Sequence, residues 1–189
     1  MAEGRLFYLM GPSGCGKDSL MRYARSLLAG DPGVMFAHRY ITRPQDGRGE
    51  SHVALSEAEF GARLRAGLFS MHWDSHGYRY GIGLEIDLWL AKGCKVVVNG
   101  SRAYLPAALG LYPDLCPILV EAPREVLEER LRRRGREAGE QMAARLRRVH
   151  QFRPGRPGLL TLENHGPLEV AGRRLTALLV GGGEDGRCS

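Results

Sequence analysis

The sequence predicts a single α/β domain with a parallel central sheet flanked by helices. Short apolar segments typical of buried strands alternate with longer segments of helical character, and this alternation is typical of a parallel sheet. The chain of 189 residues has an ordinary length for one domain, and no linker or internal repeat divides residues 1–189. One compact unit with its own hydrophobic core is therefore expected.

The N-terminal part should contain a strand, a glycine-rich turn and a helix. Residues 6–10 form a continuous apolar run, as a buried parallel strand requires. A helix is expected at 19–28, because the glycines and the proline at 29–33 end it. The next strand is expected at 34–41 and a polar loop at 42–49.

The middle of the chain should hold two helices separated by a binding loop. Ser56 followed by Glu59 is a capping box, which predicts that a helix begins there. Residues 72–83 carry aromatic side chains among glycines and indicate a binding loop. A helix is expected at 85–91, ended by Gly93.

The C-terminal part should complete the sheet and its helical layers. Further strands are expected at 96–98, 117–120 and 159–162. Pro123 suits the first turn of the arginine-rich helical region that follows it. The last helix is expected at 168–180, and residues 181–189 are expected to form a disordered tail.

Positive charge is concentrated in one segment. The sequence has 27 basic and 21 acidic residues, and 24 of the basic residues are arginines. Residues 122–156 hold 11 arginines and 5 glutamates, which is the whole excess, because the rest of the chain has 16 residues of each sign. Arginine binds phosphate in a bidentate manner, although a genome-wide preference for arginine would give the same composition. The distribution excludes a basic coat over the entire protein.

Several classes of protein are excluded by the sequence. No apolar run approaches the ~18 residues of a membrane-spanning helix, and no signal peptide is visible. The four cysteines, Cys15, Cys94, Cys116 and Cys188, form no CxxC pair, so neither a zinc site nor a redox motif is indicated. A cytoplasmic protein with reduced thiols and no membrane partner is expected.

The strongest motif is Gly-Pro-Ser-Gly-Cys-Gly-Lys at 11–17, which matches the phosphate-binding pattern G-x-x-x-x-G-K. It follows an expected strand and opens an expected helix, so backbone N–H groups and the helix N-terminus can converge on phosphates. Lys17 should reach the β- and γ-phosphates of ATP. These features predict the three-layer fold of P-loop NTPases. The residues expected to bind the nucleotide here are Gly11, Pro12, Ser13, Gly14, Cys15, Gly16, Lys17, Asp18 and Ser19.

One position departs from the pattern. After Lys17 the pattern has a Ser or Thr that binds Mg²⁺, whereas this chain has Asp18 and then Ser19. The strand at 96–98 ends at Asn99, where such folds usually place an acidic residue. Our hypothesis is that Asp18 supports Mg²⁺, directly or through water, with Asn99 as its neutral partner. The alternative is that Asp18 caps the helix.

At this point the chain resembles the guanylate kinase family over nearly its whole length. The shared residues are the phosphate loop, Thr-Arg-Pro at 42–44, Gly-Glu at 49–50, Tyr-Gly at 80–81, Arg-Leu at 130–131, Arg-Gly at 134–135 with Glu137, and Arg-Leu at 145–146. The resemblance implies an acceptor-binding insert at about 37–90. It also implies that an arginine-rich lid at about 130–147 closes on ATP.

The positions that should read guanine are different. The family's base-reading glutamate falls on Met71, and the Ser or Thr after Tyr-Gly falls on Ile82. A guanine buried against these side chains would leave polar groups unpaired, at ~1–3 kcal/mol each. Asp46 also replaces a phosphate-binding arginine, and His52 stands near an expected tyrosine. The resemblance therefore implies an acceptor other than GMP.

The chain is more closely similar to the ribose 1,5-bisphosphate phosphokinases. The resemblance rests on Gly-Lys-Asp-Ser at 16–19 and on the segments 38–44, 69–77, 80–82, 98–102 and 134–137. It implies transfer of the γ-phosphoryl group of ATP to the 1-phosphate of ribose 1,5-bisphosphate, giving 5-phosphoribosyl 1-diphosphate in phosphonate catabolism. This acceptor has two phosphates and no base.

The resemblance also implies roles for acceptor-binding side chains. Arg43 should bind an acceptor phosphate, and Arg39, Arg79 and Arg102 are further candidates, unless they form surface ion pairs. The remaining candidates are Tyr80, which could donate its hydroxyl group or pack as an ordinary aromatic residue, and His76, which could contact the ribose or a phosphate.

In the lid, Arg130 should contact the nucleotide, and Arg134 and Arg145 should act with Lys17 as catalytic residues by neutralising the transferring phosphoryl group. The attacking oxygen belongs to a phosphate that is already ionised, so no general base is needed. ATP and Mg²⁺ are the expected cofactors.

Other functions remain open at this stage. The chain could be a nucleoside monophosphate kinase, an inactive guanylate-kinase-like interaction module, or a nucleic-acid binder that uses the arginine-rich segment. The last is disfavoured because no aromatic platform is interleaved with the arginines. His72 and His76 have the i, i+4 spacing of metal ligands on a helix, but Gly77 favours a loop there. The expected partner is a phosphorylated sugar, without nucleic acid, bound by a monomer or homodimer.

Overall fold

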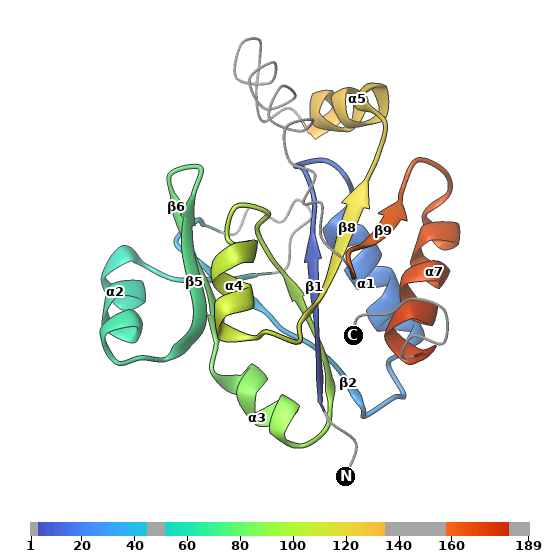
Figure 1. Ribbon diagram of the computed structural model, residues 1–189. Helices are drawn as coiled ribbons and strands as arrows, with labels where there is room; N and C mark the ends of the chain where they lie inside the picture. The colour runs from blue at the N-terminus through green and yellow to red at the C-terminus, as the bar shows by residue number, and fades with distance from the viewer. Residues whose placement is uncertain (1–3, 45–51, 135–157, 182–189) are drawn as a thin grey trace.

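A five-stranded sheet forms the centre of the protein, and all of its strands run parallel, as predicted (Figure 1). The structure, a computed structural model, describes residues 4–44, 52–134 and 158–181. The central strands are β1 (Arg5–Met10), β2 (Val34–Phe36), β7 (Lys95–Asn99), β8 (Cys116–Glu121) and β9 (Leu160–Glu163). Their order across the sheet is β2-β7-β1-β8-β9.

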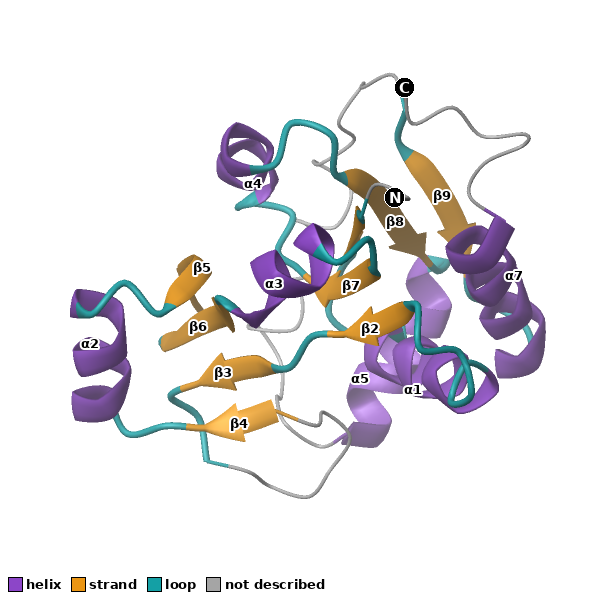
Figure 2. Ribbon diagram, turned by 90° about the horizontal axis from the view of Figure 1, so that it is seen from below, coloured by secondary structure: helices purple, strands orange, loops and turns teal. Residues whose placement is uncertain are grey.

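Helices cover both faces of this sheet (Figure 2). The helices are α1 (Lys17–Leu27), α3 (Glu85–Ala91), α4 (Leu105–Leu111), α5 (Arg124–Arg134) and α7 (Leu168–Gly181). Side chains of β1 alternate between the two faces: Phe7 and Leu9 pack in one core with α1 and α7, and Leu6, Tyr8 and Met10 pack in the other with α3 and α4. Both faces of β1 are buried, which explains its continuous apolar sequence.

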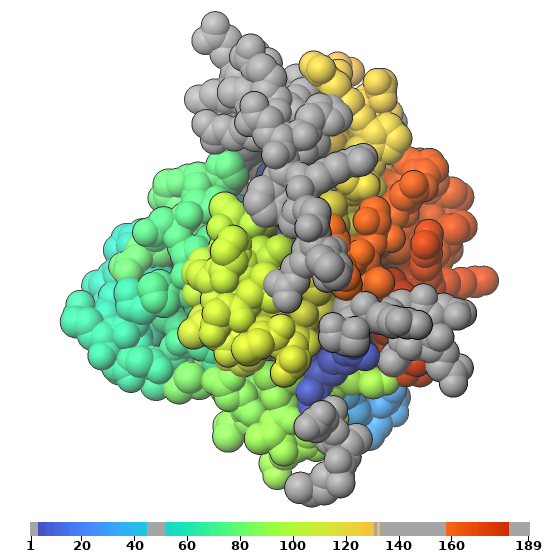
Figure 3. Space-filling model, viewed as in Figure 1, coloured from blue at the N-terminus to red at the C-terminus, as the bar shows by residue number. Residues whose placement is uncertain are grey.

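A second, four-stranded sheet lies within the predicted insert at about 37–90. It consists of β3 (Arg39–Ile41), β4 (His52–Ala54), β5 (Phe69–Ser75) and β6 (Tyr78–Gly83), in the order β4-β3-β6-β5. The helix α2 (Glu57–Arg65) covers it, with Phe60 stacked on Phe69 at 4.7 Å between ring centroids. Figure 3 shows this insert on the flank of the molecule opposite α7. Ile41 and Tyr80 share a core cluster with Tyr8, so the insert packs directly on the central sheet.

Two expectations about local structure were wrong. Residues 34–41 form two strands in different sheets. β2 pairs with β7 as far as Ala37, whose N–H donates to the carbonyl oxygen of Val97, and the chain then pairs with β6 as β3. The expected binding loop at 72–83 is mostly the β5–β6 hairpin, turned at His76 and Gly77 with φ of 52° and 76°. The alternation of buried and exposed residues along β5 has the period of a strand, but Gly77, Gly81 and Gly83, which follow β5, obscured it.

Other elements agree with the sequence analysis. The hydroxyl oxygen of Ser56 accepts the N–H of Glu59 at 3.1 Å, which confirms the predicted cap of α2. The helix α5 begins directly after Pro123, as expected, whereas α4 was not expected at all. Of the predicted lid only 130–134 lies within the described residues, and of the predicted tail only Gly181 does. Among the described helices, none has the length and apolar character needed to cross a membrane.

The end of β7 is held against β1 by a close packing contact. Tyr8 is fully buried, and its hydroxyl group donates to the carbonyl oxygen of Ser101 and accepts the N–H of Ser101, both at 2.9 Å. Burial raises the pKa of the Tyr8 phenol above its usual value, so the hydroxyl keeps the proton that it donates. A Cβ atom at Gly100 would collide with the Tyr8 ring. The turn after β7 therefore needs glycine at this position.

We expect Gly100→Ala to lower the free energy of unfolding by ~1–3 kcal/mol, because the added methyl group overpacks the Tyr8 ring. Urea denaturation measures this change. Gly110→Ala in α4 is the matched control, since nothing lies within 4 Å of its added Cβ, and it should be neutral or slightly stabilising. An unchanged unfolding midpoint for Gly100→Ala would contradict the packing argument.

Candidate functional site

The phosphate loop joins the carboxyl end of β1 to the start of α1. After β1 the chain adds β2 and β7 on one side of it and then β8 and β9 on the other, so the direction of the connections reverses at β1. Ligands of open α/β sheets bind outside the carboxyl ends of the strands at such a switch point. Gly14 and Gly16 have φ of 86° and 93°, which side chains other than glycine rarely adopt. Gly16 is the N-cap of α1 and makes no side-chain cap, so the first N–H groups of α1 are available to an anion.

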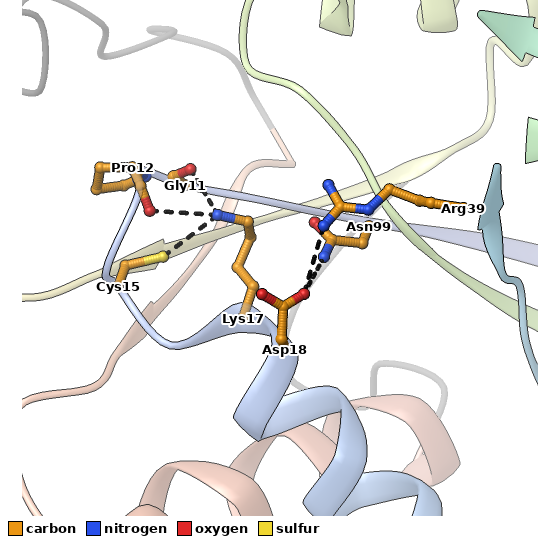
Figure 4. A network of polar contacts seen from close by, with 7 residues as sticks. All are labelled: Gly11, Pro12, Cys15, Lys17, Asp18, Arg39 and Asn99. Atoms are coloured by element: carbon orange, nitrogen blue, oxygen red, sulfur yellow. Dashed lines mark hydrogen bonds and ion pairs between the residues drawn. The ribbon is translucent and has the colours of Figure 1, made fainter. Parts of the chain in front are cut away.

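Lys17 folds over the loop that it follows (Figure 4). Its ammonium group donates to the carbonyl oxygens of Gly11 at 2.7 Å and Pro12 at 3.2 Å, and lies 3.6 Å from the sulfur of Cys15. An ammonium group has three donors and no acceptor. Phosphate oxygens bound in the loop would therefore compete with these carbonyls for Lys17.

Asp18 of α1 contacts side chains from two strands, β7 and β3. Its Oδ1 accepts the side-chain N–H of Asn99, at the end of β7, at 2.7 Å. The same oxygen lies 3.4 Å from the guanidinium group of Arg39, at the start of β3. The expected neighbourhood of Asp18 and Asn99 is therefore present, and the carboxylate bonds these two side chains while Gly16 holds the N-cap position.

The side chains around Asp18 suit a magnesium ion. Asn99 is buried, and its Oδ1 has no hydrogen-bond partner in the part of the chain that the structure describes. Mg²⁺ takes oxygen ligands and is usually held by one or two protein groups together with water and substrate phosphates. Within residues 4–44, 52–134 and 158–181, no three His, Cys, Asp or Glu side chains form a metal-binding cluster. The lack of such a cluster among the described residues also gives no support to a metal site at His72 and His76.

Asn164, which the sequence analysis missed, supports the loop from the opposite side. It follows β9, is buried, and donates its side-chain N–H to the carbonyl oxygen of Cys15 at 2.7 Å. Arg130 of α5 lies 3.4 Å from the same oxygen. A peptide plane is rigid, so holding the Cys15 carbonyl toward Asn164 turns the Gly16 N–H the other way. The sequence signal was slight: a polar residue at the carboxyl end of the last strand.

Arg39 and Arg43 lie beside one face of the insert sheet. The Arg39 guanidinium is 5.7 Å from the ring centroid of Tyr80, and the Arg43 guanidinium is 5.9 Å from that of Tyr78. Tyr78 and Tyr80 are two residues apart on β6, so their side chains share a face. Tyr80 also stacks in parallel on Trp73, with centroids 5.6 Å apart. Two predicted acceptor-binding arginines are thus brought together with Tyr80.

Arg79 lies on the other face of β6. Its guanidinium is 4.6 Å from the Phe60 ring centroid and 3.8 Å from carboxylate oxygens of both Glu57 and Asp74. The structure therefore does not bring Arg79 to Arg39 and Tyr80, and its contacts are those of the surface ion pair that the sequence analysis left open. His76 lies at the hairpin turn.

Three further predicted site residues are Arg102, Arg134 and Arg145. Arg102 follows β7, and burial lowers the pKa of its guanidinium while an electrostatic interaction with Cys15 opposes the shift. Arg134 is the last residue of α5, with its side chain outside the described part, and Arg145 lies outside the described residues altogether.

The chain is similar to curated proteins over nearly its whole length. It is 63% identical over 179 residues to ribose 1,5-bisphosphate phosphokinase PhnN of Thiobacillus denitrificans, covering 95% of this chain and 94% of that protein. It is 53% identical over 176 residues to the protein of that name from Desulfomicrobium baculatum, covering 93% of this chain and 94% of that one. The match to the Burkholderia pseudomallei protein of the same name is 53% over 182 residues, covering 96% of this chain and 98% of that one. No protein-family model matches.

Solved structures share the fold at low sequence identity. The crystal structure of guanylate kinase from Anaplasma phagocytophilum has a TM-score of 0.68 and 16% identity, covering 99% of this chain and 89% of that one. A gluconokinase from Sinorhizobium meliloti has a TM-score of 0.54 and 18% identity, covering 98% of this chain and 97% of that one. These matches confirm the predicted guanylate-kinase-like P-loop fold.

We expect Asn164→Ala to weaken ATP binding about 5–30-fold, since losing the hydrogen bond that orients the Cys15–Gly16 peptide costs about 1–2 kcal/mol. Titration calorimetry with ATP measures the effect. His165→Ala is the neighbouring control, because His165 has an exposed side chain and should leave ATP affinity unchanged. Wild-type affinity in Asn164→Ala would show that the loop holds its shape without this contact.

Proposed function

The chain belongs to the ribose 1,5-bisphosphate phosphokinase family, and from this premise we propose that it transfers the γ-phosphoryl group of ATP to the 1-phosphate of ribose 1,5-bisphosphate. The products are 5-phosphoribosyl 1-diphosphate and ADP. In the transfer, a bond forms between an oxygen of the acceptor 1-phosphate and the γ-phosphorus, and the bond from that phosphorus to the leaving oxygen of ADP breaks.

The buried pair Met71 and Ile82 carries the proposal. These two residues occupy the positions at which the guanylate kinase resemblance places the base-reading side chains. They are cross-strand partners in the β5–β6 hairpin, and both are fully buried in the core. Neither offers a polar group to a guanine, whose N–H groups would stay unpaired at ~1–3 kcal/mol each. The pair therefore favours an acceptor without a base.

The arginines of the insert support a doubly phosphorylated acceptor. Arg39 and Arg43 lie beside the face of β6 that carries Tyr78 and Tyr80. Each guanidinium can bind a phosphate through two parallel hydrogen bonds. We assign Arg43 to an acceptor phosphate and Arg39 to the acceptor side of the site.

Catalysis by this site is positioning and charge neutralisation. Lys17 and the loop N–H groups hold the triphosphate, and Arg130 approaches the loop at Cys15. Asp18 and Asn99 would hold Mg²⁺, which when bound neutralises charge on the β- and γ-phosphates. Because the attacking phosphate oxygen is already ionised, none of these residues has to remove a proton. Arg134 and Arg145 remain our proposed lid residues for the transferring group.

An acceptor panel tests the proposed reaction. With ATP and Mg²⁺, the full chain should turn over ribose 1,5-bisphosphate at ~1–100 s⁻¹, the usual range for kinases. GMP and AMP should be far poorer acceptors because the base-reading positions hold the apolar side chains of Met71 and Ile82. A coupled assay for ADP measures the turnover of each acceptor, and phosphorus NMR identifies the product. Faster turnover of GMP than of ribose 1,5-bisphosphate would overturn the proposal.

Arg43→Met should raise the acceptor KM at least about 10-fold while changing the KM for ATP little, since losing one charge-assisted phosphate contact costs ~1.5–3 kcal/mol. Steady-state kinetics with each substrate varied in turn measure both constants. Arg63→Met is the matched control, because Arg63 pairs with Glu59 on α2 away from the phosphate loop. Equal effects on both KM values would place Arg43 outside the acceptor site.

A further inference from the structure

We propose that Arg39 and the magnesium of the bound nucleotide compete for Asp18, so that binding of magnesium–ATP releases Arg39 to the acceptor phosphate. Arg39 would then be a positioning residue that couples the two substrate sites. The inference rests on the proposed function for the identity of the acceptor. The competition itself concerns only the nucleotide side and can be tested without an acceptor.

The Asp18–Arg39 pair lies between the phosphate loop and the insert sheet. Asp18 lies in the first turn of α1, directly after the phosphate loop, and Arg39 begins β3 of the insert sheet. The pair therefore joins the nucleotide side of the protein to the acceptor side (Figure 4). The two side chains are 25% and 13% exposed, so solvent screens their attraction less than it screens that of surface pairs.

The ion pair between Asp18 and Arg39 has weak geometry. The N–O distance between Arg39 and Asp18 is 3.4 Å, whereas charge-assisted hydrogen bonds are about 2.7–2.9 Å long. Asn99 bonds the same carboxylate oxygen at 2.7 Å and would hold Asp18 in place if Arg39 left. The Arg39 guanidinium also lies 5.7 Å from the ring centroid of Tyr80, on the face of β6 where we place the acceptor. Breaking the pair would therefore cost Arg39 a long contact with Asp18 and not a short charge-assisted hydrogen bond.

Both substrates act on the Arg39 guanidinium through its charge. A magnesium ion near Asp18 carries two positive charges and repels a guanidinium group a few ångströms away. An acceptor phosphate attracts the same guanidinium. Each substrate therefore disfavours the Asp18–Arg39 pair, and each should raise the affinity for the other by the same factor.

Titration calorimetry of the full chain with ribose 1,5-bisphosphate tests the coupling. In the presence of magnesium and a non-hydrolysable ATP analogue, the wild-type acceptor affinity should rise about 5–20-fold. Asp18→Asn should bind the acceptor more tightly than wild type when no nucleotide is present, because Arg39 is already released. An unchanged wild-type affinity with the analogue, or wild-type acceptor affinity in Asp18→Asn, would overturn the proposal.

ADP binding with magnesium and with a chelator tests the competition without an acceptor. The ratio of the two affinities measures how strongly the site favours the metal. In Arg39→Met this ratio should rise about 3–10-fold, since the competitor for Asp18 is gone. Arg63→Met, on α2, should leave it unchanged. A fall or no change in Arg39→Met would overturn the competition, because an arginine that only stabilises the fold or binds nucleotide gives no rise.

These readouts separate the inference from the proposed function. If ribose 1,5-bisphosphate does not bind under any condition while the ADP ratio rises as expected, the acceptor assignment is wrong and the competition stands. If the acceptor is bound and turned over but the ratio does not rise, the proposed function stands and the competition is wrong.

Discussion

The carboxylate of Asp18 connects the phosphate loop with the insert sheet, and the proposed site depends on this contact. It is held by Asn99 from the central sheet and paired with Arg39 from the insert sheet. Three separate elements thus converge on one negative charge beside the phosphate loop. In most P-loop proteins this charge sits at the end of a strand and a hydroxyl follows the lysine. Here the carboxylate follows Lys17 and the strand ends in an amide, and this exchange brings the carboxylate that we propose as a magnesium ligand within reach of the insert.

The rest of the phosphate site follows from the parallel sheet. The carboxyl ends of parallel strands lie at one edge, so the loop after β1, Asn99 at the end of β7 and Asn164 after β9 meet there. Asn164 and Arg130 hold the carbonyl of Cys15 from outside the loop. The loop therefore owes its shape to residues far along the chain as well as to its own glycines.

Much of this could be predicted from the sequence, because the relevant signals were local. The phosphate loop is a contiguous motif, and Asp18 and Asn99 could be placed together since each follows a recognisable strand. Asn164 could not be found, because an asparagine after a strand has no local pattern that reports a contact across the fold. The face on which Arg79 lies was equally hidden, because the β5–β6 hairpin was read as a loop. Side-chain direction in a strand depends on register, which a glycine-rich sequence specifies poorly.

We propose above that Arg39 and the metal of the nucleotide compete for Asp18. A crystal structure of the full chain with magnesium, a non-hydrolysable ATP analogue and ribose 1,5-bisphosphate tests it most directly. We expect the Arg39 guanidinium to contact an acceptor phosphate and to have left Asp18, which stays bonded to Asn99 and faces the metal. An Arg39–Asp18 ion pair that persists in this ternary complex would contradict it.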